Sequence, residues 1–183
     1  MRDPEIVRAD TERWLVRAVI GLNLCPFAKA AQAKGLVRIA VSEARQEEAL
    51  LDQLESELDD LIALNAAERE TTLLVAPRCL ADFLAFHDFT GRAERLLRKR
   101  GLEGVIQLAT FHPDFQFAGT DPGDITNASN RSPYPTLHLL RESSIERAVQ
   151  AFPDAAAIYE ANMDTLHRLG PEGWAALDVG ASP

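Results

Sequence analysis

The chain has 183 residues, a formal net charge of −9 and two cysteines, Cys25 and Cys79. This length suffices for a sizeable core, and we expect one α/β domain over residues 1–183. The negative charge argues against a nucleic acid or an anionic membrane as partner, because both attract a basic surface. Two cysteines are too few for a disulfide framework, and no signal peptide or membrane-spanning run is recognisable, which predicts a soluble, cytoplasmic protein.

Two helices are expected over residues 4–34. Asp3 followed by Pro4 is a typical helix start, because Asp caps free N–H groups and Pro is preorganised for the first turn. Apolar residues then recur at steps of three and four up to Gly21, where the first helix should end. A second, short helix should begin at Pro26 and end before Gly35.

Strand-like and helical stretches alternate through the rest of the chain. Four runs rich in β-branched or apolar residues predict strands: "LVRIAVSE" (36–43), "TTLLVAP" (71–77), "VIQLATFHP" (105–113) and "TLHLLRE" (136–142). Helices are expected over about 43–64 and 80–100, then over "SIERAVQAF" with Ser143 and Glu146 as a capping box, and from 155 to a stop at Gly170. The alternation predicts an α/β fold, with a layered, mixed or mostly parallel sheet of about four strands covered by helices.

Cys25 is the first candidate for chemistry. If Pro26 begins a helix, Cys25 is its N-cap residue, and the free N–H groups and positive end of that helix favour a thiolate. Lys29 adds positive charge one turn later. Such an environment makes a cysteine nucleophilic. The alternative is a small buried residue in an apolar neighbourhood, and Cys79 is interpreted in this structural way.

His112 is the second candidate, because it ends a predicted strand, where sites in α/β sheets commonly lie. Asp114 follows closely and could orient its ring as in a nucleophile–base–orienter arrangement. The alternative is a histidine whose hydrogen bonds are satisfied within the fold. His112 also opens the longest loop of the chain, over residues 112–135, and long irregular loops are often functional.

That loop carries the candidates for substrate binding: Asn127, Asn130, Arg131 and Tyr134. An arginine can bind a carboxylate or phosphate with two hydrogen bonds, which suggests a small anionic ligand. Alternatively, asparagines and aspartates can serve as turn residues that hold the loop's own backbone. We expect the loop to cover the start of the short helix and to bring the Cys25 and His112 side chains within about 8 Å.

A metal site formed by Cys25, His112 and His138 is a further hypothesis. The sequence has no compact metal motif such as CxxC or HExxH, and no dinucleotide, P-loop or serine-hydrolase motif, so no cofactor can be named. His138 lies inside a predicted strand, and a buried histidine that hydrogen-bonds within the core is the alternative.

Three segments carry a resemblance to a known family: "WLVRAVIGLNLCPFAKA", "FHPDFQFAG" and "NRSPYPTLHLLRE". Together they resemble the uncharacterised family catalogued as domain of unknown function 1415, over about Trp14 to Trp174. The resemblance implies a small, soluble, single-domain protein, and it implies no activity, substrate or cofactor.

The leading hypothesis is therefore an enzyme acting on a small anionic molecule, a cysteine-dependent hydrolase or transferase with Cys25 as nucleophile, His112 as base and Asp114 as orienter. The first alternative is a metal-dependent or metal-binding protein that uses the Cys and His ligands named above. The second is a non-catalytic interaction module that docks through the acidic helix of residues 43–64.

Overall fold

The computed structural model describes residues 3–151 and 155–183, so Phe152, the predicted end of a helix, lies outside the described residues. The helices are α1 (Pro4–Trp14), η1 (Leu15–Ile20), α2 (Ala28–Ala33), α3 (Glu47–Ala63), α4 (Phe83–Lys99), η2 (Ile125–Asn130), α5 (Glu142–Ala151) and α6 (Ala155–Ala176). The strands are β1 (Val37–Val41), β2 (Thr71–Val75), β3 (Ile106–Phe111) and β4 (Thr136–Arg141). No helix in the described ranges is long and apolar enough to span a membrane.

The four strands form one mixed sheet in the order β1-β2-β4-β3. β1 and β2 are parallel, and α3 connects them, since parallel neighbours require a crossover. β4 runs antiparallel to both of its neighbours. The predicted α/β fold with a four-stranded mixed sheet is therefore confirmed.

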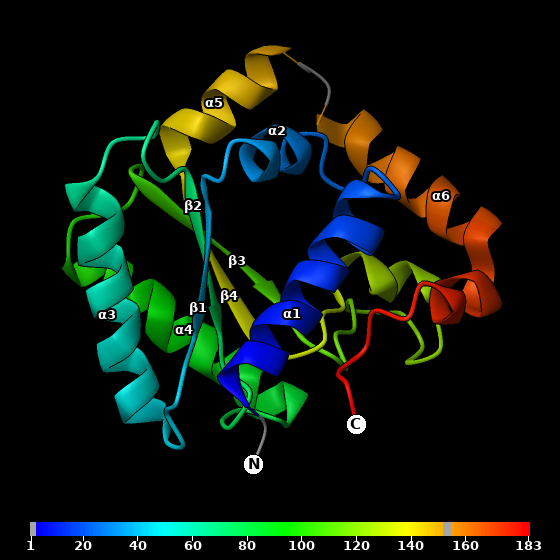
Figure 1. Cartoon of the computed structure of the whole chain (residues 1–183), viewed down its shortest axis with the longest axis horizontal. Helices are drawn as coiled ribbons and strands as arrows, with labels where there is room; N and C mark the ends of the chain where they lie inside the picture. Colours follow the sequence, from blue (N-terminus) through cyan, green and yellow to red (C-terminus); the bar gives the residue numbers. More distant parts are fainter. Residues whose placement is uncertain (1–2, 152–154) are drawn as a thin grey trace.

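Helices cover both faces of this sheet (Figure 1). Successive strand residues point to opposite faces, so each strand contributes to two cores. Leu74, Leu137 and Leu139 pack with α3 and α4 on one face. On the other face, Leu73 and Val75 pack with α1, η1 and the C-terminal segment. We call these the α4 face and the α1 face.

The acidic residues of α3 have cationic partners on α4. Arg92 binds Glu47 and Glu48, with N–O distances of 2.6 and 3.1 Å, and Arg100 binds Glu55 and Asp59. Exposed pairs of this kind contribute little stability each, typically below about 1 kcal/mol. Several acidic residues of the predicted docking helix are therefore already paired with arginines of α4.

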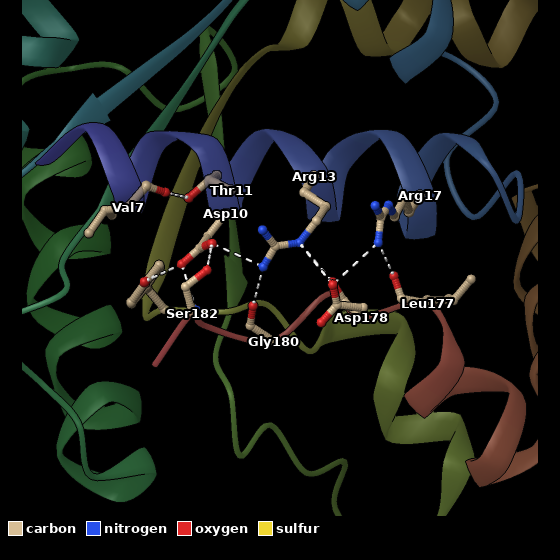
Figure 2. Close-up of polar contacts among 10 residues, drawn as sticks. Val7, Asp10, Thr11, Arg13, Arg17, Leu177, Asp178, Gly180 and Ser182 are labelled. Atoms are coloured by element: carbon tan, nitrogen blue, oxygen red, sulfur yellow. Dashed lines mark hydrogen bonds and ion pairs between the residues drawn. The ribbon is translucent and has the colours of Figure 1, made fainter. Parts of the chain in front are cut away.

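The C-terminal segment runs along α1 and is held by a buried carboxylate (Figure 2). Asp10 is 1% exposed. It accepts hydrogen bonds from the Tyr134 hydroxyl at 2.6 Å and from the backbone N–H and hydroxyl of Ser182 at 2.8 and 2.6 Å, and it pairs with Arg13 at 2.9 Å. Burial acts to raise the pKa of Asp10, but these partners together lower it below its usual value.

Two predicted boundaries near the C-terminus differ from the structure. α5 begins at Glu142, so Ser143 lies within the helix and does not form the expected capping box. Gly170 does interrupt α6, with φ of 66°, but the helix resumes and continues to Ala176. The segment beyond it, predicted as irregular, is fixed to α1 by the Asp10 contacts.

The predicted first helix changes character after Trp14. Residues Leu15–Ile20 form a π-helix, in which N–H groups bond five residues back, as Gly21 N–H does to Val16 O at 3.0 Å. π-Helical turns are rare and frequently occur at functional sites. The wider turn brings the backbone so close that a Cβ on Gly21 would lie 2.2 Å from the Arg17 carbonyl oxygen.

Gly21→Ala is therefore expected to lower the free energy of unfolding by about 2 kcal/mol or more, because a backbone oxygen has to move. Urea denaturation measures this change. Gly123→Ala is the matched control, since a Cβ there meets no atom within 4 Å. Its expected effect is within about 0.5 kcal/mol. Equal effects of the two substitutions would contradict the close approach at Gly21.

Candidate functional site

A cavity of about 300 Å³ lies on the α1 face of the sheet, bordered by η1, α2 and α5. Most of its wall is apolar, including Trp14, Leu15, Val19, Phe27, Leu73 and Phe111. This volume falls at the lower end of the range that small-molecule pockets occupy.

Small residues leave this space open. Ala28 and Ala31 of α2 and Ala109 of β3 line the cavity. Ala109 pairs across the sheet with His138 of β4, and Leu73 of β2 pairs with His138 from the other side. A larger side chain at any of the three alanines would fill part of the volume.

Five residues contribute polar or ionisable side chains to the wall: Cys25, Glu70, Thr71, His138 and Ser144. Glu70 is paired with Arg147 at 3.5 Å, and Arg147 also donates to the Ser144 hydroxyl at 3.0 Å. Among the described residues, no lysine or arginine lines the cavity.

The hydrogen bonds of Thr71 fix the protonation of the His138 ring. The Thr71 hydroxyl lies 2.7 Å from the Leu139 carbonyl oxygen, which can only accept, so the hydroxyl proton is donated there. His138 Nε2 lies 2.5 Å from the same hydroxyl oxygen and must donate its own proton to it. The ring is therefore the Nε2–H tautomer, and Nδ1 carries an unshared electron pair.

His138 is neutral at physiological pH. Burial lowers its pKa from the ordinary 6.5 to about 4, because the charged ring would lose hydration. The ring is nevertheless half-buried by surface area, and because it lines the cavity, its accessible part faces that space. In the part of the chain that the structure describes, Nδ1 has no hydrogen-bond partner.

Cys25 also lines the cavity, but not as a helix cap. α2 begins at Ala28 and has only six residues, so the predicted helix start at Pro26 is wrong. Cys25 instead lies in an irregular turn, where its carbonyl oxygen accepts from the Ala28 N–H at 3.2 Å. Asn23, two residues earlier, has φ of 54°, a conformation that asparagine tolerates better than most residues.

His112 is placed elsewhere. It is fully buried, and its ring stacks near Phe83 and Phe86 of α4, with centroid distances of 5.4 and 5.1 Å. Nε2 donates to the Leu80 carbonyl oxygen at 3.1 Å, and Nδ1 accepts from the backbone N–H of Asp114 at 3.0 Å. Burial lowers its pKa as well. Both ring nitrogens of His112 are thus hydrogen-bonded to backbone groups.

The structure consequently does not bring Cys25 and His112 together. His112 contacts the core of the α4 face, whereas Cys25 packs against the core of the α1 face. The His112 ring accepts its hydrogen bond from the backbone N–H of Asp114 and not from the carboxylate, because Asp114 is exposed and a carboxylate cannot donate. The predicted base and orienter therefore lie across the sheet from the predicted nucleophile, because β3 directs alternate residues to opposite faces.

The four predicted substrate-binding residues bind the loop itself, β3 or α1. Asn127 is fully buried and accepts from the Phe117 N–H and the Thr120 hydroxyl, both at 2.9 Å. Asn130 donates to the Thr110 carbonyl oxygen at 3.2 Å, and Arg131 donates to the carbonyl oxygens of Phe115 and Pro122. Tyr134 donates to Asp10. None of the four lines the cavity among its described residues.

The loop does reach the segment before Cys25, from the side of α6. Ala128 and Ile125 of η2 pack with Leu24, and the indole N–H of Trp14 donates to the Arg131 carbonyl oxygen at 2.8 Å. The loop therefore packs against residues of the cavity wall, and none of its residues belongs to the lining in the described part of the chain.

A shared metal site is not formed by the predicted ligands. Cys25 and His138 line one cavity, but His112 lies on the opposite face of the sheet. Within residues 3–151 and 155–183, no group of three or more His, Cys, Asp or Glu side chains could hold a metal ion.

Thr71, which determines the His138 tautomer, is not among the residues that the sequence predicts for the site. Thr71 and His138 lie on β2 and β4, strands that are far apart in the chain, and the pairing of two distant strands gives no local signal. Their positions do carry a weaker sign: each is a polar residue in a strand that is otherwise largely apolar.

The His138 ring should make folding stability depend on pH. Between pH 6.5 and about 4 the ring is protonated in the unfolded chain but not in the folded protein. The free energy of unfolding therefore falls as the pH falls through this window. From about pH 7 to about pH 5, wild-type protein should lose about 2 kcal/mol more than His138→Phe. Urea denaturation at both pH values measures this difference.

His87→Gln is the control for that experiment, because His87 is exposed on α4. It should keep the wild-type pH dependence. If His138→Phe and His87→Gln lose the same stability on acidification, the ring of His138 titrates as in the unfolded chain and the neutral assignment is wrong.

The comparisons with known proteins identify a family without identifying an activity. No curated protein and no solved structure matches the chain. The family described as "Protein of unknown function (DUF1415)" matches residues 6–176. The matched residues include the π-helix, the cavity-lining residues Cys25 and His138, and the loop of residues 112–135. The chain therefore belongs to the DUF1415 family.

Proposed function

We propose that this protein binds a small, mostly apolar molecule in the cavity on the α1 face of the sheet. The observation that carries the proposal is the combination of an apolar wall with a neutral histidine whose ring lines the space and whose Nδ1 has no hydrogen-bond partner among the described residues. Ligand pockets typically combine an apolar lining with a few polar groups that orient the ligand.

The volume limits the size of the ligand. An apolar cavity of about 150 Å³ in another protein accommodates benzene. The cavity here has about twice that volume, about 300 Å³. It therefore suits a molecule of about 10–12 non-hydrogen atoms, such as a bicyclic aromatic compound.

Naphthalene is expected to bind saturably, with one equivalent per chain, in isothermal titration calorimetry. Ala31→Leu should weaken this binding by at least about tenfold, because its side chain lies in the cavity wall and the added methyl groups fill the space. Ala30→Leu is the matched control, since Ala30 is the exposed neighbour on the same helix.

Unchanged naphthalene affinity in Ala31→Leu would place the binding site elsewhere. The absence of any naphthalene binding to the folded wild-type protein would overturn the proposed function itself.

A second candidate function is catalysis on the bound molecule with Cys25 as nucleophile, as its thiol belongs to a residue that lines the same cavity. The sulfur would attack an ester carbonyl carbon, so that an S–C bond forms, the C–O bond breaks and the thiol proton passes to the departing alcohol oxygen. Water would then cleave the thioester to a carboxylic acid and restore the thiol.

His138 supports this candidate only as a hydrogen-bond acceptor. A group with pKa of about 4 is a weak base toward a thiol, whose ordinary pKa is near 8.5. No hydrogen bond joins Cys25 to His138 among the described residues, so a substrate would have to lie between them. Binding therefore has more support than catalysis.

Phenyl acetate, a neutral ester small enough for the cavity, tests the catalytic candidate. Wild-type protein should release phenol and gain one acetyl group on Cys25 by mass spectrometry, and Cys25→Ser should lose at least about a hundredfold in rate. Cys79→Ser is the control, because Cys79 is buried in the core of the α4 face and burial raises the pKa of its thiol. Equal rates in both variants would exclude a nucleophilic Cys25.

A further inference from the structure

We propose that the cavity selects neutral molecules that carry a hydrogen-bond donor, and that Nδ1 of His138 accepts that donor. This inference rests on the proposed binding function and names the class of ligand. It differs from the small anionic molecule that the sequence suggested through Arg131.

The hydrogen-bond geometry determines which kind of polar group the ligand must have. Since Thr71 donates to the Leu139 carbonyl oxygen, its hydroxyl oxygen remains for His138 Nε2–H, and the ring presents only an acceptor to the cavity. A ligand without a donor would leave Nδ1 unpaired once water is displaced. Leaving a buried acceptor unpaired costs about 1–3 kcal/mol.

The charges around the cavity determine that the ligand is neutral. Glu70 is the carboxylate in the described lining, and its partner Arg147 has a side chain that is 56% exposed. An anion would therefore enter an apolar space with a carboxylate at its edge and no lining cation. Burying an unpaired charge is far more costly than burying a paired polar group.

Arg131 cannot reverse this preference. Its guanidinium donates to the carbonyl oxygens of Phe115 and Pro122 and lies outside the cavity lining. Size, neutrality and the need for one donor together indicate compact phenols or alcohols, with an aromatic or alicyclic body of about 10–12 non-hydrogen atoms.

Three probes of similar shape separate these contributions: 2-naphthol, naphthalene and 2-naphthoate, compared by isothermal titration calorimetry at about pH 7. We expect 2-naphthol to bind at least about tenfold more tightly than naphthalene, because only 2-naphthol satisfies Nδ1. We expect 2-naphthoate to bind most weakly, because it brings an unpaired charge.

His138→Phe provides the matched variant, since it removes the acceptor and keeps an aromatic ring. It should lose the tenfold preference for 2-naphthol, so that 2-naphthol and naphthalene bind this variant with similar affinity. Should this variant fail to fold, 2-methoxynaphthalene on the wild-type protein gives the same comparison, because its methyl group removes only the donor. It should then bind no more tightly than naphthalene.

Each outcome separates this inference from the proposed function. Equal affinities for 2-naphthol and naphthalene, or tightest binding of 2-naphthoate, would overturn the donor inference while leaving the binding site in place. No binding of any probe would overturn the proposed function and the inference together. Long-range ¹H–¹⁵N spectra of His138 add an independent test: a proton on Nδ1 in the ligand-free protein would overturn the inference.

Discussion

β4 is the strand on which the arrangement depends, because it hydrogen-bonds to β2 on one side and to β3 on the other. Its alternation sends Leu137 and Leu139 to the core beneath α3 and α4, and His138 to the cavity beneath α1. A slip of one residue in this pairing would exchange the two sets. The cavity, its histidine and the two cores are thus consequences of one register.

His112 and His138 illustrate how surroundings decide the role of the same side chain. Both donate from Nε2, and burial lowers the pKa of both rings. At His112 the second nitrogen accepts a backbone N–H, so the ring holds together the end of β3 and the Leu80 turn, where φ is 61°. At His138 the second nitrogen has no such partner within the described residues, and the ring lines the cavity. Only the latter ring is available to a ligand.

The sequence predicted the four strands, most helices and the family, because periodicity and long motifs are local signals. It could not predict the helix start at Ala28, since Cys25 followed by Pro26 also fits a turn. It left the role of the polar loop residues open, because residue type alone does not distinguish an Asn or Arg that binds a ligand from one that binds carbonyl groups of its own loop, as Asn127 and Arg131 do. The cavity depends on small residues from separate elements, Ala31 and Ala109, and therefore on distant strand and helix packing.

The contact between Asp10 and Ser182 joins residues 172 positions apart. During synthesis, Asp10 leaves the ribosome long before Ser182 exists, so its carboxylate lacks these two hydrogen-bond donors until Ser182 has been made. The inner side of α1 then cannot reach its full stability before Ser182 has been made. α1 is therefore completed only after a residue 172 positions later has been made, which lengthens the time during which its apolar residues are accessible to chaperones.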